Sequence, residues 1–216
     1  CMFFIFIGTA ASYTAAQAAL SWRLQPRLTA ALATHTQSAD ASVAGVAMYA
    51  AAGLSTWDDG HAATYAAAPG VLAAVMRRLH GRSAGAVELL ARAYAALALA
   101  VLAWYPPLLQ LHPATRGGAA LDAVCASLRE APALDAVGLR SHTAALWAMS
   151  AWGEEARDRI AAAPGVLAAL VDAAEAVGCG ASEPLGALAS LASSEHVAMA
   201  LVGDARIPPL LAGVLH

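Results

Sequence analysis

The nine residues AAAPGVLAA occur twice in this chain, at positions 66–74 and 161–169, so the second copy begins 95 residues after the first. Weaker copies lie at about half that spacing. When the copies are aligned on the valine of this phrase, the equivalent residues are Leu28, Val71, Ala120, Val166 and Ile207. Successive residues in this series are 43, 49, 46 and 41 positions apart. A recurrence of roughly 40 to 50 residues is typical of arrays built from stacked helical units.

A second periodic pattern supports the first. Each copy is followed by a few polar or small residues and then by a longer Ala-rich segment. Each of these segments has one large apolar residue at an equivalent position, which we call its anchor. The anchors are Leu54, Leu102, Met149 and Leu191, and they are 48, 47 and 42 residues apart. A third, shorter segment leads into the next copy. We therefore predict units of three helices with a Pro-Gly or Gly-Gly break before the second helix. We expect Val71 and Val166 at equivalent positions and the four anchors on successive buried helices.

Alanine makes close stacking of such units possible, because 61 of the 216 residues are Ala. Ala favours the helix more than any other residue and has a small side chain, so the long helix of each unit can be apolar nearly all round where its neighbours cover it. Outside the first seven residues, no window alternates apolar and polar residues as a half-buried strand would. The predicted fold class is all-α.

The sequence RDRIAAAPGVLAALV at 157–171, then EPLGALASLAS at 183–193 and DARIPPLLAGVL at 204–215, resembles the armadillo repeat. The second helix of that repeat commonly opens with a Gly-[Ala/Gly]-Ile-Pro-Pro-Leu phrase. The resemblance implies a right-handed α-solenoid of about four three-helix repeats over residues 24–216, and it is weakest at 105–118. HEAT repeats, with two helices per unit, are the near neighbour and also satisfy the spacing.

Composition excludes several classes of function. The net charge is -3 and only 12% of residues are charged, which leaves no basic footprint for nucleic acid. The three cysteines, Cys1, Cys125 and Cys179, lie far apart, as expected in the cytoplasm or another reducing intracellular compartment rather than in a disulfide framework or zinc site. The seven His residues are never three or four apart, so we predict no metal and no cofactor.

Two apolar stretches could suggest a membrane. Residues 93–111 carry no charge, but Pro106 and Pro107 limit a helix there to about 13 residues or ~20 Å, less than the ~30 Å hydrocarbon core, so a membrane span is not expected. The first seven residues, CMFFIFI, contain all three Phe of the chain. They are open to interpretation as a buried strand, a docking or anchoring element, or the end of a fragment or misjoined gene.

One short motif suggests an enzyme. Residues 81–85 read Gly-Arg-Ser-Ala-Gly, which matches the G-x-S-x-G nucleophile elbow with Ser83 as the nucleophile. That elbow needs a buried strand before it, whereas residues 71–79 have apolar positions at helical spacing. We therefore interpret residues 81–85 as a loop between helices. A hydrolase using Ser83 remains the less favoured alternative, and the chain is predicted not to be an enzyme.

The resemblance implies a binding surface on the third helices, because armadillo proteins of the importin-α and β-catenin kind hold extended peptides there with a ladder of Asn. This chain has no Asn. The residues that align with the Asn ladder are Gly53, Val101, Ala148 and Ser190. The residues one helical turn earlier are Tyr49, Leu97, Ala144 and Gly186.

On this face we predict Tyr49, Arg140 and Ser190 as partner-binding residues, because Tyr and Arg dominate interface energetics. The predicted function is a non-catalytic protein–protein interaction scaffold that binds a partner protein or peptide, with no small-molecule substrate. The alternative is a structural subunit of a larger or membrane-associated assembly.

The predicted organisation is a hydrophobic segment with a leading helix at 1–23 and a repeat array at 24–216. The last copy stops after its second helix, so Ile207, Leu210, Leu211 and Leu215 lack the third helix that would cover them. Terminal repeats ordinarily have a polar outer face. We therefore expect this chain to be a section of a longer array.

Extension by one native repeat should raise the melting temperature and reduce self-association, because each exposed Leu or Ile forgoes about 1.5–3 kcal/mol of burial. Calorimetry and analytical ultracentrifugation measure the two effects. A 216-residue chain that is monomeric and no less stable than the extended one contradicts the expectation.

Overall fold

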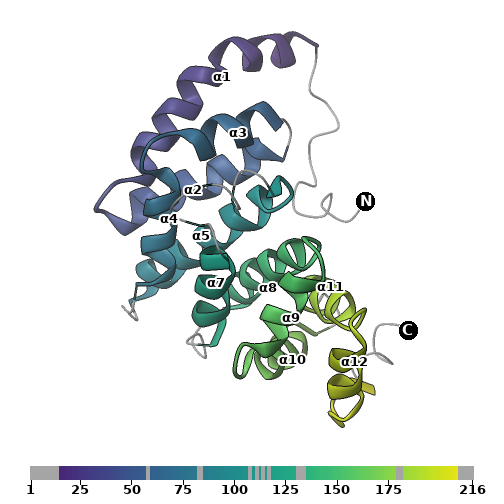
Figure 1. The fold of residues 1–216 in the computed structure, drawn as a ribbon. Coiled ribbons are helices and arrows are strands. Elements are labelled where there is room, and N and C mark those ends of the chain that lie inside the picture. The colour runs from purple at the N-terminus through teal and green to yellow at the C-terminus, as the bar shows by residue number, and fades with distance from the viewer. Residues whose placement is uncertain are drawn as a thin grey trace.

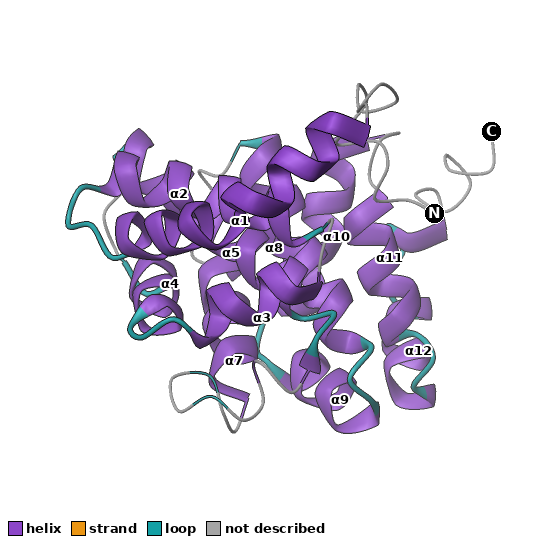
Figure 2. Ribbon diagram, turned by 90° about the horizontal axis from the view of Figure 1, so that it is seen from above, coloured by secondary structure: helices purple, strands orange, loops and turns teal. Residues whose placement is uncertain are grey.

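The structure, a computed structural model, describes residues 15–56, 59–81, 85–106, 118–129, 135–178 and 182–208, together with residues 109, 112 and 115. For residues 15–25, Asp59 and His196 it describes the backbone alone. Figure 2 shows that the regular elements within these ranges are helices, with no strand among them, which confirms the all-α class. Several predictions fall outside the described residues, namely those on CMFFIFI, Cys1, Ser83, Cys179, Leu210, Leu211 and Leu215.

The long axis of the molecule follows the chain, from α1 at the purple end of Figure 1 to α12 at the yellow end. The helices are α1 (Ala15–Thr36), α2 (Ala41–Ser55), α3 (Asp59–Ala67), α4 (Val71–Leu79), α5 (Ala86–Leu102), α7 (Ala119–Arg129), α8 (Ala136–Ser150), α9 (Glu154–Ala162), α10 (Val166–Val177), α11 (Ser182–Leu191) and α12 (Glu195–Val202).

Two rows of helices pack against each other. The inner row contains α2, α5, α8 and α11, each in extensive contact with the next. The second row contains α1, α4, α7 and α10, which also contact one another in order, and α4 and α7 pack on α5 and α8 of the inner row. α3 connects α2 to α4 and contacts both, and α9 connects α8 to α10 and contacts both. The hydrophobic core is continuous along both rows.

The duplicated phrase belongs to a duplicated structure. α8 follows α2 at a spacing of 95 residues at both ends, as does α9 after α3, and α10 begins 95 residues after α4. Asp40 and Asp135 cap the two long helices: each carboxylate accepts hydrogen bonds from backbone N–H groups of the first turn. Tyr65 in α3 and Ile160 in α9 are equivalent, and both are buried.

Glycine sets the start of the second helix of these units. Gly70 and Gly165 have φ of 81° and 76°, a left-handed conformation that only Gly adopts without strain, and α4 and α10 begin at the next residue. The preceding Pro carbonyls accept hydrogen bonds from Gln37 Nε2 at 2.9 Å and Arg129 Nη1 at 3.2 Å. Val71 and Val166 are therefore equivalent first residues, both fully buried, as predicted.

The predicted register is wrong at Leu28. It lies inside α1 and is 44% exposed, because α1 runs without a break through Pro26. No glycine precedes this position to supply the left-handed turn seen at Gly70. The chain instead continues as one helix, although Pro26 has no N–H to donate to the carbonyl four residues earlier. The predicted domain boundary between residues 23 and 24 accordingly falls within a helix.

Three of the four predicted anchors are correct. Leu102, Met149 and Leu191 are buried on α5, α8 and α11, which pack in succession. Leu54 lies on α2, as expected, but is only partly buried, because it borders the groove described below. α5 ends at Leu102, before Pro106, as predicted.

Within the described residues no single helix has the length and apolarity to cross a membrane. α9 and α10 meet that criterion only when they are taken together, and the pair is bent by 87°.

The inner helices approach closely because small residues face each other. A Cβ built on Gly45 of α2 would lie 3.1 Å from the Cα of Ala91 in α5 and 3.3 Å from its Cβ. Seven Ala and Leu positions of α5 beyond Ala91 are almost fully buried, at Ala93, Ala95, Ala96, Ala98, Leu99, Ala100 and Leu102. Such contacts leave no space for a larger side chain at Gly45.

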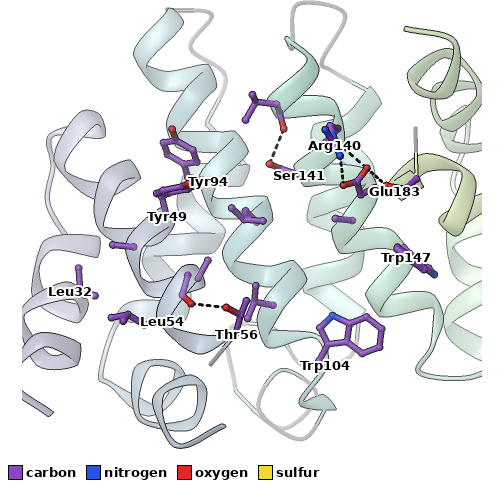
Figure 3. A pocket seen from close by; sticks show the side chains of 18 of the residues that line it. Leu32, Tyr49, Leu54, Thr56, Tyr94, Trp104, Arg140, Ser141, Trp147 and Glu183 are labelled. Carbon is purple, nitrogen blue, oxygen red and sulfur yellow. Dashed lines mark hydrogen bonds and ion pairs between the residues drawn. The ribbon is translucent and has the colours of Figure 1, made fainter. Parts of the chain in front are cut away.

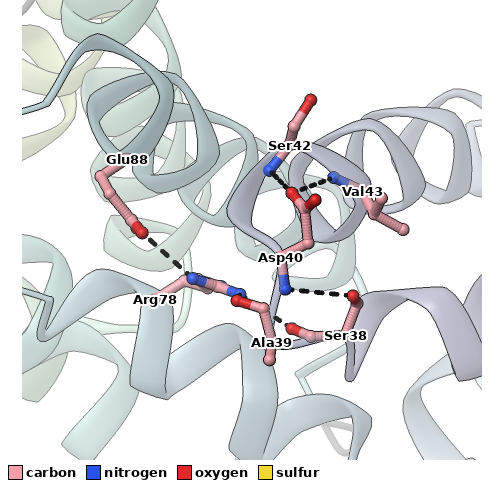
Figure 4. A network of polar contacts seen from close by, with 7 residues as sticks. All are labelled: Ser38, Ala39, Asp40, Ser42, Val43, Arg78 and Glu88. Carbon is pink, nitrogen blue, oxygen red and sulfur yellow. Dashed lines mark hydrogen bonds and ion pairs between the residues drawn. The ribbon is translucent and has the colours of Figure 1, made fainter.

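Arg78 joins three segments at one end of the inner row, as Figure 4 shows. Its Nη2 donates to the carbonyl oxygens of Ser38 at 2.8 Å and Ala39 at 2.9 Å, in the loop between α1 and α2. Its Nη1 lies 3.3 Å from Glu88 Oε2 in the first turn of α5. The guanidinium therefore satisfies loop carbonyls and neutralises an acidic side chain at the same time.

Replacing Gly45 with Leu should lower the free energy of unfolding by about 1–3 kcal/mol, because the side chain overpacks the contact with Ala91. Gly53→Leu is the matched control in the same helix, since a Cβ at Gly53 meets no atom within 4 Å. Its stability should be unchanged or raised by up to about 1 kcal/mol through helix propensity. Urea unfolding measures both; equal stabilities would contradict close packing at Gly45.

Candidate functional site

A groove with a volume of about 500 Å³ crosses the inner row of helices, bounded at one end by α1 and at the other by α11. Figure 3 shows side chains from several helices converging on it. The residues that line it are Leu28, Leu32, Tyr49, Ala50, Ala52, Gly53, Leu54, Thr56, Tyr94, Leu97, Val101, Trp104, Val137, Arg140, Ser141, Ala144, Trp147, Ser182 and Glu183. The volume is in the range of about 300–1,000 Å³ that is usual for ligand sites.

Aromatic side chains form the walls. Tyr49 of α2 and Tyr94 of α5 pack with ring centroids 4.9 Å apart and planes tilted by 44°, a favourable aromatic geometry. Trp104 follows the end of α5 and is 48% exposed, and Tyr49 is 47% exposed. Tyr49 and Tyr94 therefore offer apolar surface from packed helices, and Trp104 offers it from the turn just after α5.

Trp147 limits the groove toward α11. A Cβ built on Gly186 would lie 2.7 Å from two atoms of the Trp147 indole, so the ring covers this glycine. The absence of a side chain at Gly186 thus allows Trp147 to lie flat between α8 and α11. In Figure 3 Trp147 and Trp104 lie at the same end of the groove, away from the Tyr pair.

The charged side chains lining the groove are Arg140 of α8 and Glu183 of α11, and they bind each other. Arg140 Nε donates to Glu183 Oε2 at 3.1 Å and Arg140 Nη2 donates to Oε1 at 2.9 Å, a bidentate pair visible in Figure 3. Ser182 Oγ also donates to Glu183 Oε2. Both side chains are partly buried, so the pair links two inner helices and leaves the groove with no net charge.

Two of the three predicted partner-binding residues meet in this groove. Tyr49 and Arg140 line it, whereas Ser190 does not, because its Oγ accepts a hydrogen bond from Ser150 Oγ at 2.6 Å between α8 and α11. Among the predicted ladder positions, Gly53, Val101, Tyr49, Leu97 and Ala144 line the groove. Ala148 is buried, and Trp147 covers Gly186, so the predicted register fails toward α11.

Sequence reasoning missed the other aromatic residues. Tyr94 and Trp104 each lie three residues from the predicted positions Leu97 and Val101, and Trp147 lies three residues after Ala144. Residues three apart share a helix face. Extending the predicted face by this spacing would have identified all three.

A Ser–His pair lies elsewhere in the core. Ser127 of α7 and His142 of α8 are buried, with Oγ and Nε2 2.8 Å apart. His142 Nδ1 lies 2.8 Å from the Gly138 carbonyl oxygen, which can only accept, so Nδ1 donates and Nε2 accepts from Ser127. Burial, the largest effect, lowers the pKa of His142 to about 4. Neither residue lines the groove, so the pair is arranged as a core hydrogen bond without access for substrate.

Other reactive groups are also enclosed. Burial raises the pKa of the Cys125 thiol to about 12, which keeps it protonated and unreactive. Within the described ranges, no three His, Cys, Asp or Glu side chains are placed to hold a metal ion. Among the described residues, the groove has the volume and the apolar lining of a ligand site.

Comparison with protein-family models, with curated proteins and with solved structures finds no match to this chain. The resemblance to armadillo repeats therefore depends on the residues quoted above.

Acid should destabilise this protein through His142. The folded-state pKa near 4 is below the ordinary 6.5, so the contribution is complete above pH 6.5 and is lost as the pH falls toward 4, by about 2–3 kcal/mol. Urea unfolding between pH 7 and pH 4.5 should show a smaller loss in His142→Asn than in the wild type. Equal losses in the two proteins would show that His142 does not contribute.

Proposed function

We propose that this chain is a non-catalytic interaction scaffold that binds an apolar segment of a partner protein in the groove across its inner helices. One observation supports this most strongly: large apolar side chains, Leu28, Tyr49, Trp104 and Val137, are 40–48% exposed along a single groove. Contiguous exposed apolar surface of this kind marks interaction sites in folded proteins. Tyr and Trp are also the residues that most often dominate binding energy.

The proposal includes a fold of higher order: an α-solenoid of armadillo-like three-helix repeats. The contacts between successive inner helices, the 95-residue repetition of three helices and their caps, and the left-handed Gly70 and Gly165 support it. Stacked units of this type form extended surfaces suited to elongated partners.

The groove chemistry defines the ligand. Arg140 and Glu183 neutralise each other, so the ligand needs no charge to match. The Asn side chains that hold a peptide backbone in the best-known armadillo proteins are absent. Affinity therefore comes from apolar and aromatic ligand side chains packed on Tyr49, Tyr94 and Trp104. Such binding depends weakly on salt, because screening acts on charges.

Peptides selected from a displayed random library by binding to the wild-type chain provide the test. We expect the selected peptides to be rich in aromatic and aliphatic residues. Trp104→Ala and Tyr49→Ala should each weaken them at least about tenfold, as truncated hot spots do. Isothermal titration at low and physiological ionic strength measures both the loss and the weak dependence on salt.

Met199→Ala and Val202→Ala are the controls. Both residues are on α12, are 70% and 76% exposed and are absent from the groove lining, so they remove apolar surface elsewhere. Peptides that bind Trp104→Ala and Tyr49→Ala as tightly as the wild type, or that are predominantly charged, would refute the groove as the binding site.

A further inference from the structure

The groove offers apolar surface that no described segment covers. Tyr49 and Trp104 are about half exposed, and Leu28 of α1 extends this surface at one end. A segment that covers these side chains has to be apolar, rich in aromatic groups and free of charge, because the Arg140–Glu183 pair is already satisfied.

The first residues of this same chain have that chemistry. Residues 1–7, CMFFIFI, contain Phe3, Phe4 and Phe6 and two Ile, and the first charged residue of the chain is Arg23. The three Phe are the only ones in the protein. No other seven-residue segment of the chain contains as many large apolar side chains. No charged residue occurs among the first 22 residues of the chain.

The distance is also compatible. Residues 1–7 are joined through residues 8–14 to Ala15, the first residue of α1, and α1 carries Leu28 to the groove. Ala15 and Leu28 are 13 residues apart, which is ~20 Å along a helix. The seven residues 8–14 span up to ~24 Å when extended, enough to return along α1.

We propose that residues 1–7 are an internal ligand of the groove and compete with partner peptides for it. The inference rests on the proposed function of the groove. A tethered ligand acts at an effective concentration in the millimolar range, so a partner has to displace it and binds with reduced apparent affinity. The groove then responds to whatever removes residues 1–7, such as a second binding protein or proteolysis.

The test follows the groove tryptophans in the free 216-residue chain. 5-Fluorotryptophan labelling gives one ¹⁹F resonance for each of the five Trp, and Trp104→Phe and Trp147→Phe identify the two in the groove. Relaxation caused by a soluble nitroxide reports solvent access. We expect Trp104 to gain access when Phe3, Phe4 and Phe6 are all replaced by Ser, because each substitution weakens docking about tenfold.

Three controls accompany this variant. Trp152, whose Nε1 donates to the Ala103 carbonyl at 2.7 Å, is the internal reference and should not change. The double variant Met199→Ser, Val202→Ser removes exposed apolar surface on α12 and should leave Trp104 as in the wild type. Far-UV circular dichroism confirms that each variant is folded. A synthetic peptide of residues 1–10, added to the Phe variant, should restore the protection of Trp104.

The outcomes separate this inference from the proposed function. If Trp104 is equally accessible in the wild type and the Phe variant, the inference is wrong, even if library peptides bind the groove. If Trp104 is protected in the wild type alone, the inference holds, even if no partner peptide is found. Binding to phosphatidylcholine vesicles through residues 1–7, with Trp104 unchanged, would identify a membrane anchor instead and would also overturn it.

A functional readout completes the experiment. Selected library peptides should bind the Phe variant at least about tenfold more tightly than the wild type, since the competing internal ligand is weakened. Equal affinities for the two proteins would contradict competition.

Discussion

The close contact between neighbouring inner helices, made by Gly and Ala, determines the rest of the structure. Where Gly45 meets Ala91, α2 and α5 approach too closely for any larger side chain. Large apolar residues are buried on the second row, at Val71, Leu72 and Leu79, and at other positions of the inner row, at Leu99, Leu146 and Met149. Small residues such as Gly45 and Ala91 thus allow α2 and α5 to pack at short distance.

Polar groups then fix the relative positions of these helices. The Arg78 guanidinium connects the loop before α2 to the start of α5, and the Arg140–Glu183 pair connects the starts of α8 and α11. The buried hydrogen bond between Ser127 and His142 fixes α7 against α8. Interfaces of small apolar residues permit sliding, because they have few interlocking side chains. Directional hydrogen bonds at the helix ends oppose it, since they hold only at one register.

Local chemistry explains which parts of this fold the sequence could predict. The helical class and the equivalence of Val71 and Val166 depend on periodicity and on the Pro-Gly break, whose left-handed glycine is a property of a few adjacent residues. The continuity of α1 through Pro26 was missed because proline usually kinks or breaks a helix interior, whereas α1 continues through it. Of the predicted partner-binding residues, Tyr49 and Arg140 line the groove and Ser190 does not, because the rotation of α11 against α8 is not determined by spacing along the chain. Trp104 and Trp147 were missed although each lies three residues from a predicted position on the same face.

The 95-residue duplication gives the groove a direction. Positions that are equivalent in α2 and α8 carry side chains of opposite size: Gly45 corresponds to Arg140, Tyr49 to Ala144 and Ala52 to Trp147. In the groove lining, α2 therefore presents the bulky Tyr49 and the small Ala52, whereas α8 presents the small Ala144 and the bulky Trp147. An elongated ligand of the kind proposed above would therefore meet different shapes in its two orientations along the groove.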